Sequence, residues 1–268
     1  MVEEIPTTPK REPHIEIRNL TMAYGDFVVM RDLNFTIGKG DIFIIMGGSG
    51  CGKSTLLRHM IGLIEPAKGE VLYHGKSFTR ADPEERRQML QSFGVLYQKG
   101  ALWSSMTLAE NIGVPLEEYT DLGRSEIHEI ARLKLSLVGL RGFEEYYPNQ
   151  ISGGMQKRAG LARAMALDPE VLFFDEPSAG LDPISSRLLD ELILQLRDSL
   201  GATVVVVTHE LASIFTIGDN SVLLDAGART MIAQGHPKEL LARSKYPRVR
   251  RFLTRGQENG KEVSEAPQ

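Results

Sequence analysis

The sequence predicts an α/β fold whose core is a parallel sheet, with an antiparallel β subdomain near the amino terminus and an inserted helical subdomain. Three short runs carry this prediction, because they are continuously apolar, as expected of strands buried on both faces. A glycine-rich turn or helical patterns separate them, which is the alternation typical of such folds. The runs are 42–46, 171–174 and 204–207.

Apolar residues that alternate with polar ones predict the antiparallel subdomain. Alternation is the pattern of a strand with one buried face, and antiparallel sheets commonly have one such face. The alternating positions are Ile15, Ile17, Leu20, Met22 and Tyr24, followed by Leu33, Phe35 and Ile37.

Helix starts are visible at two Asp-Pro pairs. Asp82 and Asp182 each offer a capping carboxylate, followed by a proline suited to the first helical position. Ser152 is a third capping residue, for a helix that extends to about Ala166. Between about Gln98 and Ala166 helical patterns dominate and no buried strand is predicted, which indicates the inserted helical subdomain.

The domain organisation follows from composition. We predict a disordered, proline-containing segment over 1–13, one domain over 14–240, and an extension over 241–268 whose polar end, 256–268, is disordered. No run approaches the roughly 18 apolar residues that span a bilayer, so a membrane role must come through a partner. The net charge of −4 predicts no nucleic-acid partner. The single cysteine, Cys51, allows no internal disulfide and suits a reducing compartment.

A glycine-rich segment after the first buried run predicts a nucleotide site. Residues 47–54 read Gly-Gly-Ser-Gly-Cys-Gly-Lys-Ser, which fits the phosphate-binding loop. Glycines let the backbone N–H groups point at phosphate oxygens, and a helix from Thr55 to about Ile64 adds its positive end. Lys53 is expected at the β- and γ-phosphates and Ser54 at Mg²⁺. The predicted binding residues are Gly47, Gly48, Ser49, Gly50, Cys51, Gly52, Lys53, Ser54 and Thr55.

Two carboxylates end the second buried run. Asp175 and Glu176 would be costly to bury unpaired. A Mg²⁺ ion beside Asp175 supplies the missing charge, and Glu176 can orient and deprotonate an attacking water. Together with the phosphate loop, this pair predicts nucleotide hydrolysis.

Residues 151–158, Ile-Ser-Gly-Gly-Met-Gln-Lys-Arg, resemble the signature Leu-Ser-Gly-Gly-Gln of the ABC ATPases. Ser152, Gly153 and Gly154 match, and they precede the Asp-Glu strand as in that family. Met155 departs from the pattern, because it replaces glutamine; activity is expected to persist because the phosphate-facing residues are intact. The resemblance covers about residues 14–240 and implies a P-loop NTPase core of the RecA-like type.

Further family elements follow in order. Gln98 resembles the glutamine of the Q-loop, Ser178–Asp182 resembles the D-loop, His209 resembles the switch histidine, and Tyr24 resembles the aromatic residue that stacks on adenine. The resemblance implies that two copies trap two ATP molecules, with Ser152–Gly154 of one copy facing the phosphate loop of the other.

The resemblance also assigns roles and partners. It makes ATP and Mg²⁺ the cofactors, and the permease coupling helix is expected to dock near the Q-loop. The implied catalytic residues are Glu176, His209 and Gln98; the metal ligands are Ser54, Gln98 and Asp175; Tyr24, Ser152, Gly153, Gly154 and Asp182 complete the nucleotide contacts.

Four segments resemble the ATPase of the Mla and related Mce-type phospholipid transporters of Gram-negative bacteria. They are 98–102, 152–155, 182–184 and 247–253. The implied partners are a permease dimer, an Mce-domain lipid-binding protein and, in some systems, a STAS-domain protein. The implied location is peripheral, on the cytoplasmic face of the inner membrane.

Three alternatives remain open. In the first, the same ATPase powers a transporter for another substrate. A soluble ABC ATPase of DNA repair or translation usually carries long insertions or two ATPase units, and neither is seen here. A small-molecule kinase would not need Ser152–Gly154, Glu176 and His209 together. The basic segment 245–253 has three interpretations: a solvated helix face, attraction to an anionic membrane, or a grip on the opposite protomer.

Overall fold

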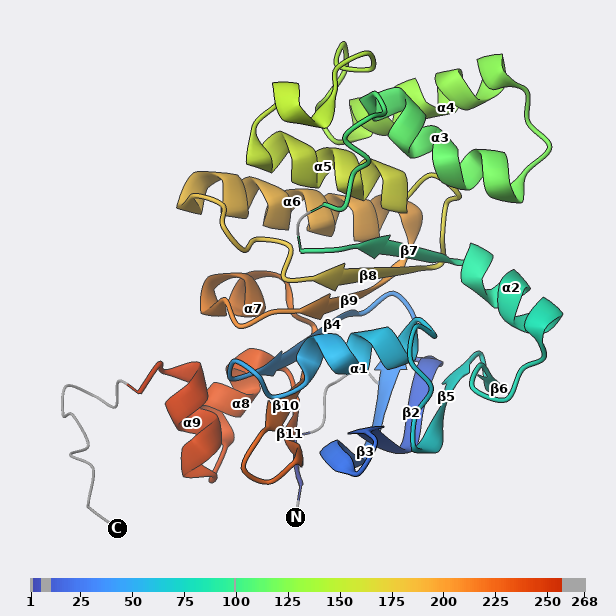
Figure 1. Ribbon diagram of the computed structural model, residues 1–268. Helices are drawn as coiled ribbons and strands as arrows, with labels where there is room; N and C mark the ends of the chain where they lie inside the picture. Colours follow the sequence, from blue (N-terminus) through green and yellow to red (C-terminus); the bar gives the residue numbers. More distant parts are fainter. Residues whose placement is uncertain (1, 6–10, 99, 257–268) are drawn as a thin grey trace.

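Two β-sheets with helices between and around them form the protein, in a computed structural model that describes residues 2–5, 11–98 and 100–256 (Figure 1). The larger sheet has the strand order β1-β11-β10-β4-β9-β8-β7, and the smaller has the order β3-β2-β5-β6. In the larger sheet only the β10–β11 pair is antiparallel, whereas the smaller sheet is antiparallel throughout. The predicted fold class is confirmed.

The strands of the larger sheet are β1 (Glu3–Glu4), β4 (Ile42–Gly47), β7 (Phe93–Leu96), β8 (Val171–Asp175), β9 (Thr203–Val207), β10 (Asn220–Asp225) and β11 (Thr230–Gly235). Those of the smaller sheet are β2 (Pro13–Tyr24), β3 (Phe27–Gly38), β5 (Lys68–Tyr73) and β6 (Lys76–Ser77). The helices are α1 (Lys53–Met60), α2 (Pro83–Gln91), α3 (Leu108–Tyr119), α4 (Arg124–Leu137), α5 (Gly153–Ala164), α6 (Pro183–Leu200), α7 (Leu211–Ile217), α8 (Pro237–Arg243) and α9 (Pro247–Leu253), with a 3₁₀ turn over Pro148–Gln150.

The central strands separate two hydrophobic cores. Successive side chains of a strand point to opposite faces of the sheet. Phe43 and Ile45 of β4 therefore join a core with α1 and the smaller sheet, whereas Ile42 and Ile44 join a core with the helices on the other face. Both faces are buried, which explains why this strand is continuously apolar in sequence.

Capping residues position three helices as predicted. The Asp82 carboxylate accepts from the backbone N–H groups of residues 84 and 85, and the Asp182 carboxylate accepts from those of 184 and 185. Ser152 Oγ accepts from the backbone N–H of Met155 at the start of α5. Such caps stabilise a helix by about 1 kcal/mol each.

Helices α3, α4 and α5 pack together as a layer above the edge of the larger sheet, where α5 contacts β7 (Figure 1). This layer lies within the stretch predicted to be helical. No helix in the described ranges combines the length and the apolar character needed to cross a bilayer.

Two expectations differ from the structure. Glu3–Glu4 form strand β1 beside β11 instead of a disordered segment, because Glu3 also bonds Ser244 Oγ and the backbone N–H of Lys245. Helix α1 ends at Met60, before the predicted Ile64, where Gly62 turns into the left-handed region (φ 75°). Helix α8 crosses the predicted domain boundary and packs on the core through Leu240, and α9 of the extension packs there through Val249 and Leu253. The predicted disorder at 1, 6–10 and 257–268 lies outside the described residues.

Candidate nucleotide site

The phosphate loop follows β4, and two of its glycines are required by close contacts. At Gly47 (φ 153°) a Cβ would lie 2.7 Å from the carbonyl oxygen of Leu224. At Gly52 (φ 93°) it would lie 2.9 Å from Val29 Cγ1. Any larger residue would displace neighbouring strands or a loop whose backbone must approach phosphate. The predicted loop conformation therefore has a steric cause at these two positions.

Lys53 begins α1 and is almost fully buried. Its Nζ donates to the carbonyl oxygens of Gly47 (2.9 Å) and Gly48 (3.1 Å), so the lysine spans the loop that precedes it. The same Nζ lies 4.0 Å from Glu176 Oε1. A buried cation held at the mouth of the loop provides the positive charge that a triphosphate needs.

Ser54 and Asp175 meet although they are far apart in sequence. Ser54 Oγ donates to Asp175 Oδ1 (2.8 Å). Burial raises the pKa of Asp175, and the bond from Ser54 only partly offsets this. A hydroxyl and a carboxylate oxygen are the hard ligands that Mg²⁺ prefers, so these two residues fit the predicted metal.

Glu176 and His209 form the second polar pair of the site. His209 Nδ1 donates to Glu176 Oε1 at 2.8 Å. The backbone of Glu176 has a φ of 49°, in the left-handed region that costs free energy for a residue with a side chain. Its Oε2 is buried and has no hydrogen-bond partner among the described residues. A carboxylate oxygen left without a donor can accept a proton or a hydrogen bond from a water molecule.

A cavity of about 530 Å³ joins these groups. Its lining includes Gln98, Glu176, His209 and Tyr24. The remaining lining residues are Phe27, Val29, Ser49, Gly50, Gly52, Lys53, Ser54 and Thr55. Most of the predicted site residues are therefore brought together.

Two aromatic rings stand at the rim of this cavity. Tyr24 is 50% exposed and Phe27 is 60% exposed, both at the turn between β2 and β3. Arg229 lies over the Phe27 ring, 5.5 Å from its centroid. Phe27 was not predicted, although its place three residues after Tyr24 in a turn was a usable signal.

Ser152, Gly153, Gly154 and Asp182 do not line this cavity. They lie together elsewhere, because a Cβ built on Gly154 would stand 3.8 Å from Ser185 Oγ, next to the Asp182 cap. The helix N-termini of α5 and α6 are therefore neighbours on a separate surface. One copy of the chain holds the two halves of the predicted site apart.

Lys157 connects the signature helix to the Asp-Glu strand, and sequence reasoning missed it. It lies on α5 and is buried, and burial lowers its pKa. Its Nζ donates to the carbonyl oxygens of Pro177 (2.6 Å), Ala179 (2.6 Å) and Glu176 (3.4 Å). Lys157 therefore holds the loop after β8 through the backbone carbonyl groups of that loop. Every residue type carries such groups, so the sequence alone carries no signal of this contact.

Helix α9 lies beside the phosphate loop. A cavity of about 590 Å³ is lined by Gly48, Ser49 and His209 together with Arg251 and Arg255 of the extension. Within the same chain, Arg248 Nη1 of the basic segment 245–253 pairs with Asp225 (3.0 Å), and Arg255 Nη2, two residues after the segment, pairs with Glu210 (3.2 Å). The basic segment is thus partly paired on its own protomer; the membrane and dimer interpretations stay predictions.

Comparison with known proteins places the chain in a family. The family model described as "ABC transporter" matches residues 30–179. The intermembrane phospholipid transport ATP-binding protein MlaF of Haemophilus influenzae is 39% identical over 246 residues, 92% of each chain. A probable ribonucleotide transport ATP-binding protein, mkl, of Mycobacterium tuberculosis is 41% identical over 89% of this chain. The chain spans 66% of the length of that mycobacterial relative.

Solved structures agree with this placement. A dimeric ATP-binding cassette in a post-hydrolysis state, bound to ADP and Pi, is 28% identical, with a TM-score of 0.74, over 83% of this chain and 98% of that chain. The protein cbiO1 of Clostridium perfringens, described as part of the ABC transporter complex cbiONQ, gives a TM-score of 0.78 at 27% identity, over 86% of this chain and 92% of that chain. The chain therefore belongs to the ABC transporter family.

Proposed function

We propose that this subunit powers a membrane transporter that moves phospholipid, and that two copies of the chain enclose two ATP molecules to do so. The observation that carries the cargo assignment is the similarity to MlaF, whose name states intermembrane phospholipid transport and which is matched along 92% of both chains. The cavity that Tyr24 lines together with the Glu176–His209 pair supports the ATP site.

Within one copy, different residues bind the phosphates, the adenine and Mg²⁺, and accept the proton of the attacking water. Lys53 and the loop backbone hold the β- and γ-phosphates, while Tyr24 and Phe27 offer ring faces to the adenine. Ser54, Asp175 and Gln98 would hold Mg²⁺, which supplies positive charge for the phosphate oxygens. Glu176 accepts a proton from the attacking water, and His209 holds the Glu176 carboxylate by its bond to Oε1. The orphaned Oε2 is the atom that supports this proposal.

The second copy supplies the missing donors. Ser152, Gly153 and Gly154 open α5, whose N-terminus carries backbone N–H groups and a partial positive charge. Placed against the γ-phosphate of the opposite protomer, they would complete the anion site. ATP would then join the two subunits, and its hydrolysis would weaken the joint.

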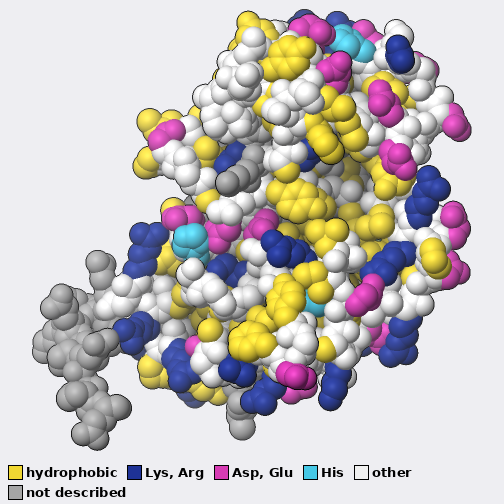
Figure 2. All heavy atoms as spheres, viewed as in Figure 1, with side chains coloured by type: hydrophobic (Ala, Val, Ile, Leu, Met, Phe, Trp, Pro, Cys, Tyr) yellow, Lys and Arg dark blue, Asp and Glu magenta, His cyan; other side chains and the backbone are white. Residues whose placement is uncertain are grey.

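A groove beside β7 is the proposed docking site for the permease. Its volume is about 380 Å³, and it lies between β7, α3 and the end of α5. The lining is largely apolar and includes Tyr97, Trp103 and Pro115, next to Gln98. Figure 2 shows hydrophobic side chains gathered in a hollow between the helical layer and the sheet below it. An apolar helix of a membrane partner fits this chemistry.

Trp103→Glu tests the docking site. The side chain is 58% exposed, so the substitution should leave the fold intact while placing a charge in the groove. We expect the variant to lose copurification with its permease. Leu133→Glu is the control, because Leu133 is 57% exposed on α4 away from the groove. Equal copurification of the Trp103 variant and the wild type would remove this docking site.

The cargo is tested on the intact complex. The complex is captured from its host membranes through a tag on this chain, and the bound small molecules are identified by mass spectrometry. Glycerophospholipid, together with a multi-helix permease and Mce-domain or STAS-domain partners, is the expected result. Peripheral attachment at the cytoplasmic face of the inner membrane is expected as well. Ribonucleotide cargo instead would favour the function named for the mycobacterial relative, and absence of lipid would contradict the proposal.

A further inference from the structure

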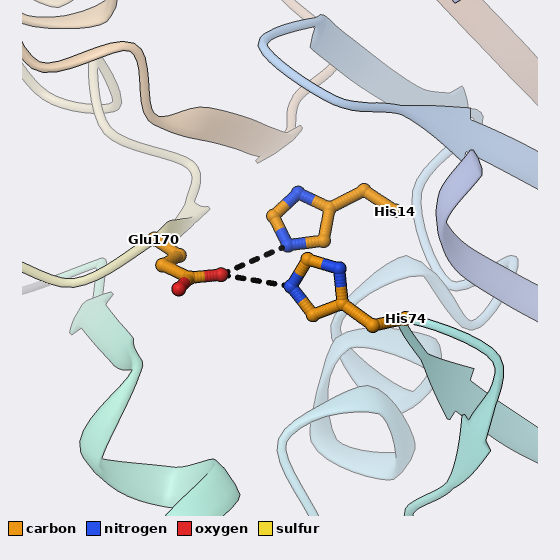
Figure 3. Close-up of side chains that lie close together, drawn as sticks. All are labelled: His14, His74 and Glu170. Carbon is orange, nitrogen blue, oxygen red and sulfur yellow. Dashed lines mark hydrogen bonds and ion pairs between the residues drawn. The ribbon is translucent and has the colours of Figure 1, made fainter. Parts of the chain in front are cut away.

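Two histidines and a glutamate converge far from the nucleotide site, at the opposite end of the parallel strands. His14 lies on β2, His74 in the turn between β5 and β6, and Glu170 directly before β8 (Figure 3). The Nε2 atoms of His74 and His14 lie 2.8 and 3.6 Å from the same Glu170 oxygen. One ligand atom from each of the three side chains can be chosen so that these atoms lie within 4.8 Å of one another.

His14 is held in place from behind. It is 2% exposed, and its Nδ1 lies 2.6 Å from Thr203 Oγ1, the first residue of β9. Thr203 Oγ1 is itself fixed, because it accepts from the backbone N–H of Gly40 (2.8 Å). With Nδ1 bonded to Thr203, the other nitrogen, Nε2, faces the cluster. A bond to the second ring nitrogen is what orients histidine ligands in metal sites.

His74 is fixed beside His14 by the backbone. The N–H of His74 donates to the carbonyl oxygen of His14 (2.9 Å), and the two ring centroids lie 4.3 Å apart. His74 has a φ of 49°, a left-handed conformation that the turn imposes and that aims its ring at Glu170. His74 is 49% exposed, so the cluster is open to solvent on one side and an ion can enter.

We propose that His14, His74 and Glu170 bind a divalent transition-metal ion of the Zn²⁺ class, with water as the fourth ligand. Two imidazole nitrogens and one carboxylate oxygen are a three-residue zinc set, and nitrogen ligands select transition metals over Mg²⁺ and Ca²⁺. Lys39 lies near enough to oppose a cation, and Glu12 near enough to offset part of that effect.

The proposed ion has a structural role. It would join the smaller sheet, through His14 and His74, to the larger sheet, through Glu170. Asp175 ends β8 and His209 comes after β9, so these nucleotide-site residues lie at the carboxyl ends of the two strands, whereas the proposed ion would lie at their amino ends. Binding is therefore expected to stabilise the fold without entering the hydrolysis reaction.

The test is a titration of the full-length, nucleotide-free protein with Zn²⁺, followed by calorimetry and by thermal unfolding. We expect one equivalent to bind and to raise the unfolding temperature. Glu170→Gln and His74→Gln should each weaken binding by at least about 10–100-fold, the range seen for lesser changes around metal sites. The His74 side chain is 49% exposed and the Glu170 side chain is 59% exposed, so neither substitution should disturb the core. Circular dichroism of each variant checks that it folds.

Two controls separate this site from other histidine sites. His128→Gln removes a similar exposed pair, with Glu145 at 3.2 Å, that has no second histidine. His209→Gln removes the histidine of the nucleotide cavity. Neither should change the affinity. Equal Zn²⁺ affinity in wild type and both cluster variants, loss of binding in the His209 variant, or no binding at stoichiometric Zn²⁺ would each overturn the proposal.

Discussion

The two halves of the predicted ATP site differ in how much of their chemistry one chain completes. In the phosphate-loop half, each charged group already has a partner: Lys53 on backbone carbonyls, Asp175 on Ser54, and Glu176 on His209. In the signature half, Ser152 and Asp182 cap the starts of α5 and α6, and neither lines the cavity.

This difference indicates where a second copy acts. We expect the phosphate-loop half to bind nucleotide alone, because its cation, hydroxyl and loop lie on one protomer. The signature half offers the N-terminus of α5, which the neutral Ser152 caps and whose first turn carries no acidic residue, and a helix N-terminus favours negative charge. Binding and hydrolysis should therefore respond differently to substitutions in the two halves.

The largest effect is expected at Glu176. Glu176→Gln keeps the side chain's shape but removes the proton acceptor, so ATP hydrolysis should fall by about 10²–10⁴-fold. ATP affinity should be retained, and a closed dimer should accumulate. Steady-state hydrolysis and size-exclusion chromatography with ATP measure the two properties. Turnover at the wild-type rate would remove Glu176 as the base.

Ser152→Arg tests the other half. A bulky cation at the start of α5 should disturb the donors of this signature in the one ATP site that it faces, and reduce hydrolysis there by about 10²–10³-fold. Nucleotide binding to the single chain should be unchanged, unlike in Lys53→Ala, where it should weaken. Asp82→Ala is the control, because it removes a comparable helix cap on α2 outside both halves. If Ser152→Arg lost ATP affinity in the isolated chain, the two halves would not be separate.

Lys157 physically links the two halves, and Lys157→Met would break that link. The carbonyl oxygens of Pro177 and Ala179 lose their donor, at a cost of about 1–3 kcal/mol in unfolding free energy. Hydrolysis should fall by about tenfold because the loop that carries Glu176 loosens. Lys134→Met is the matched control, a buried lysine of the helical layer that pairs with Asp168. A variant as stable and active as the wild type would show that the link is unimportant.

The smallest effect concerns Asp190, on the helix that Asp182 starts. Burial raises its pKa to about 6, and its Oδ1 has no hydrogen-bond partner among the described residues. Protonation in the folded state therefore adds stability that is present below about pH 4 and lost as the pH rises through 6. Asp190→Asn should stabilise the protein by about 1–3 kcal/mol at pH 8 and very little at pH 4. Denaturant unfolding at both pH values measures this, and equal effects would contradict the pKa.

The elements that the sequence predicted share a local cause. Buried strands such as Ile42–Gly47 are apolar along their whole length, and the capped helices begin at Asp-Pro or Ser-Gly, so a few neighbouring residues suffice. The phosphate loop is likewise a contiguous motif.

The features that sequence reasoning missed depend on distant partners. Strand β1 forms because the Glu3 carboxylate accepts hydrogen bonds from Ser244 Oγ and the backbone N–H of Lys245. Lys157 donates to backbone carbonyl groups, which any residue would carry. His14, His74 and Glu170 lie on three separate elements. Helix α9 contributes Val249 and Leu253 to the core, so a deletion of 244–268 would remove core residues as well as any dimer contact. Substitution of exposed Arg250 or Arg251 is a cleaner test of the dimer hypothesis.

The most direct measurement joins two inactive chains. Lys53→Ala and Ser152→Arg, each with its own affinity tag, are co-expressed with the permease, and complexes that carry both tags are purified. One site of this mixed dimer combines the intact phosphate loop of one copy with the intact signature of the other. We expect ATP hydrolysis to reappear in the mixed complex, well above either variant alone. Hydrolysis no higher than in the parent variants would contradict an ATP site built from two chains.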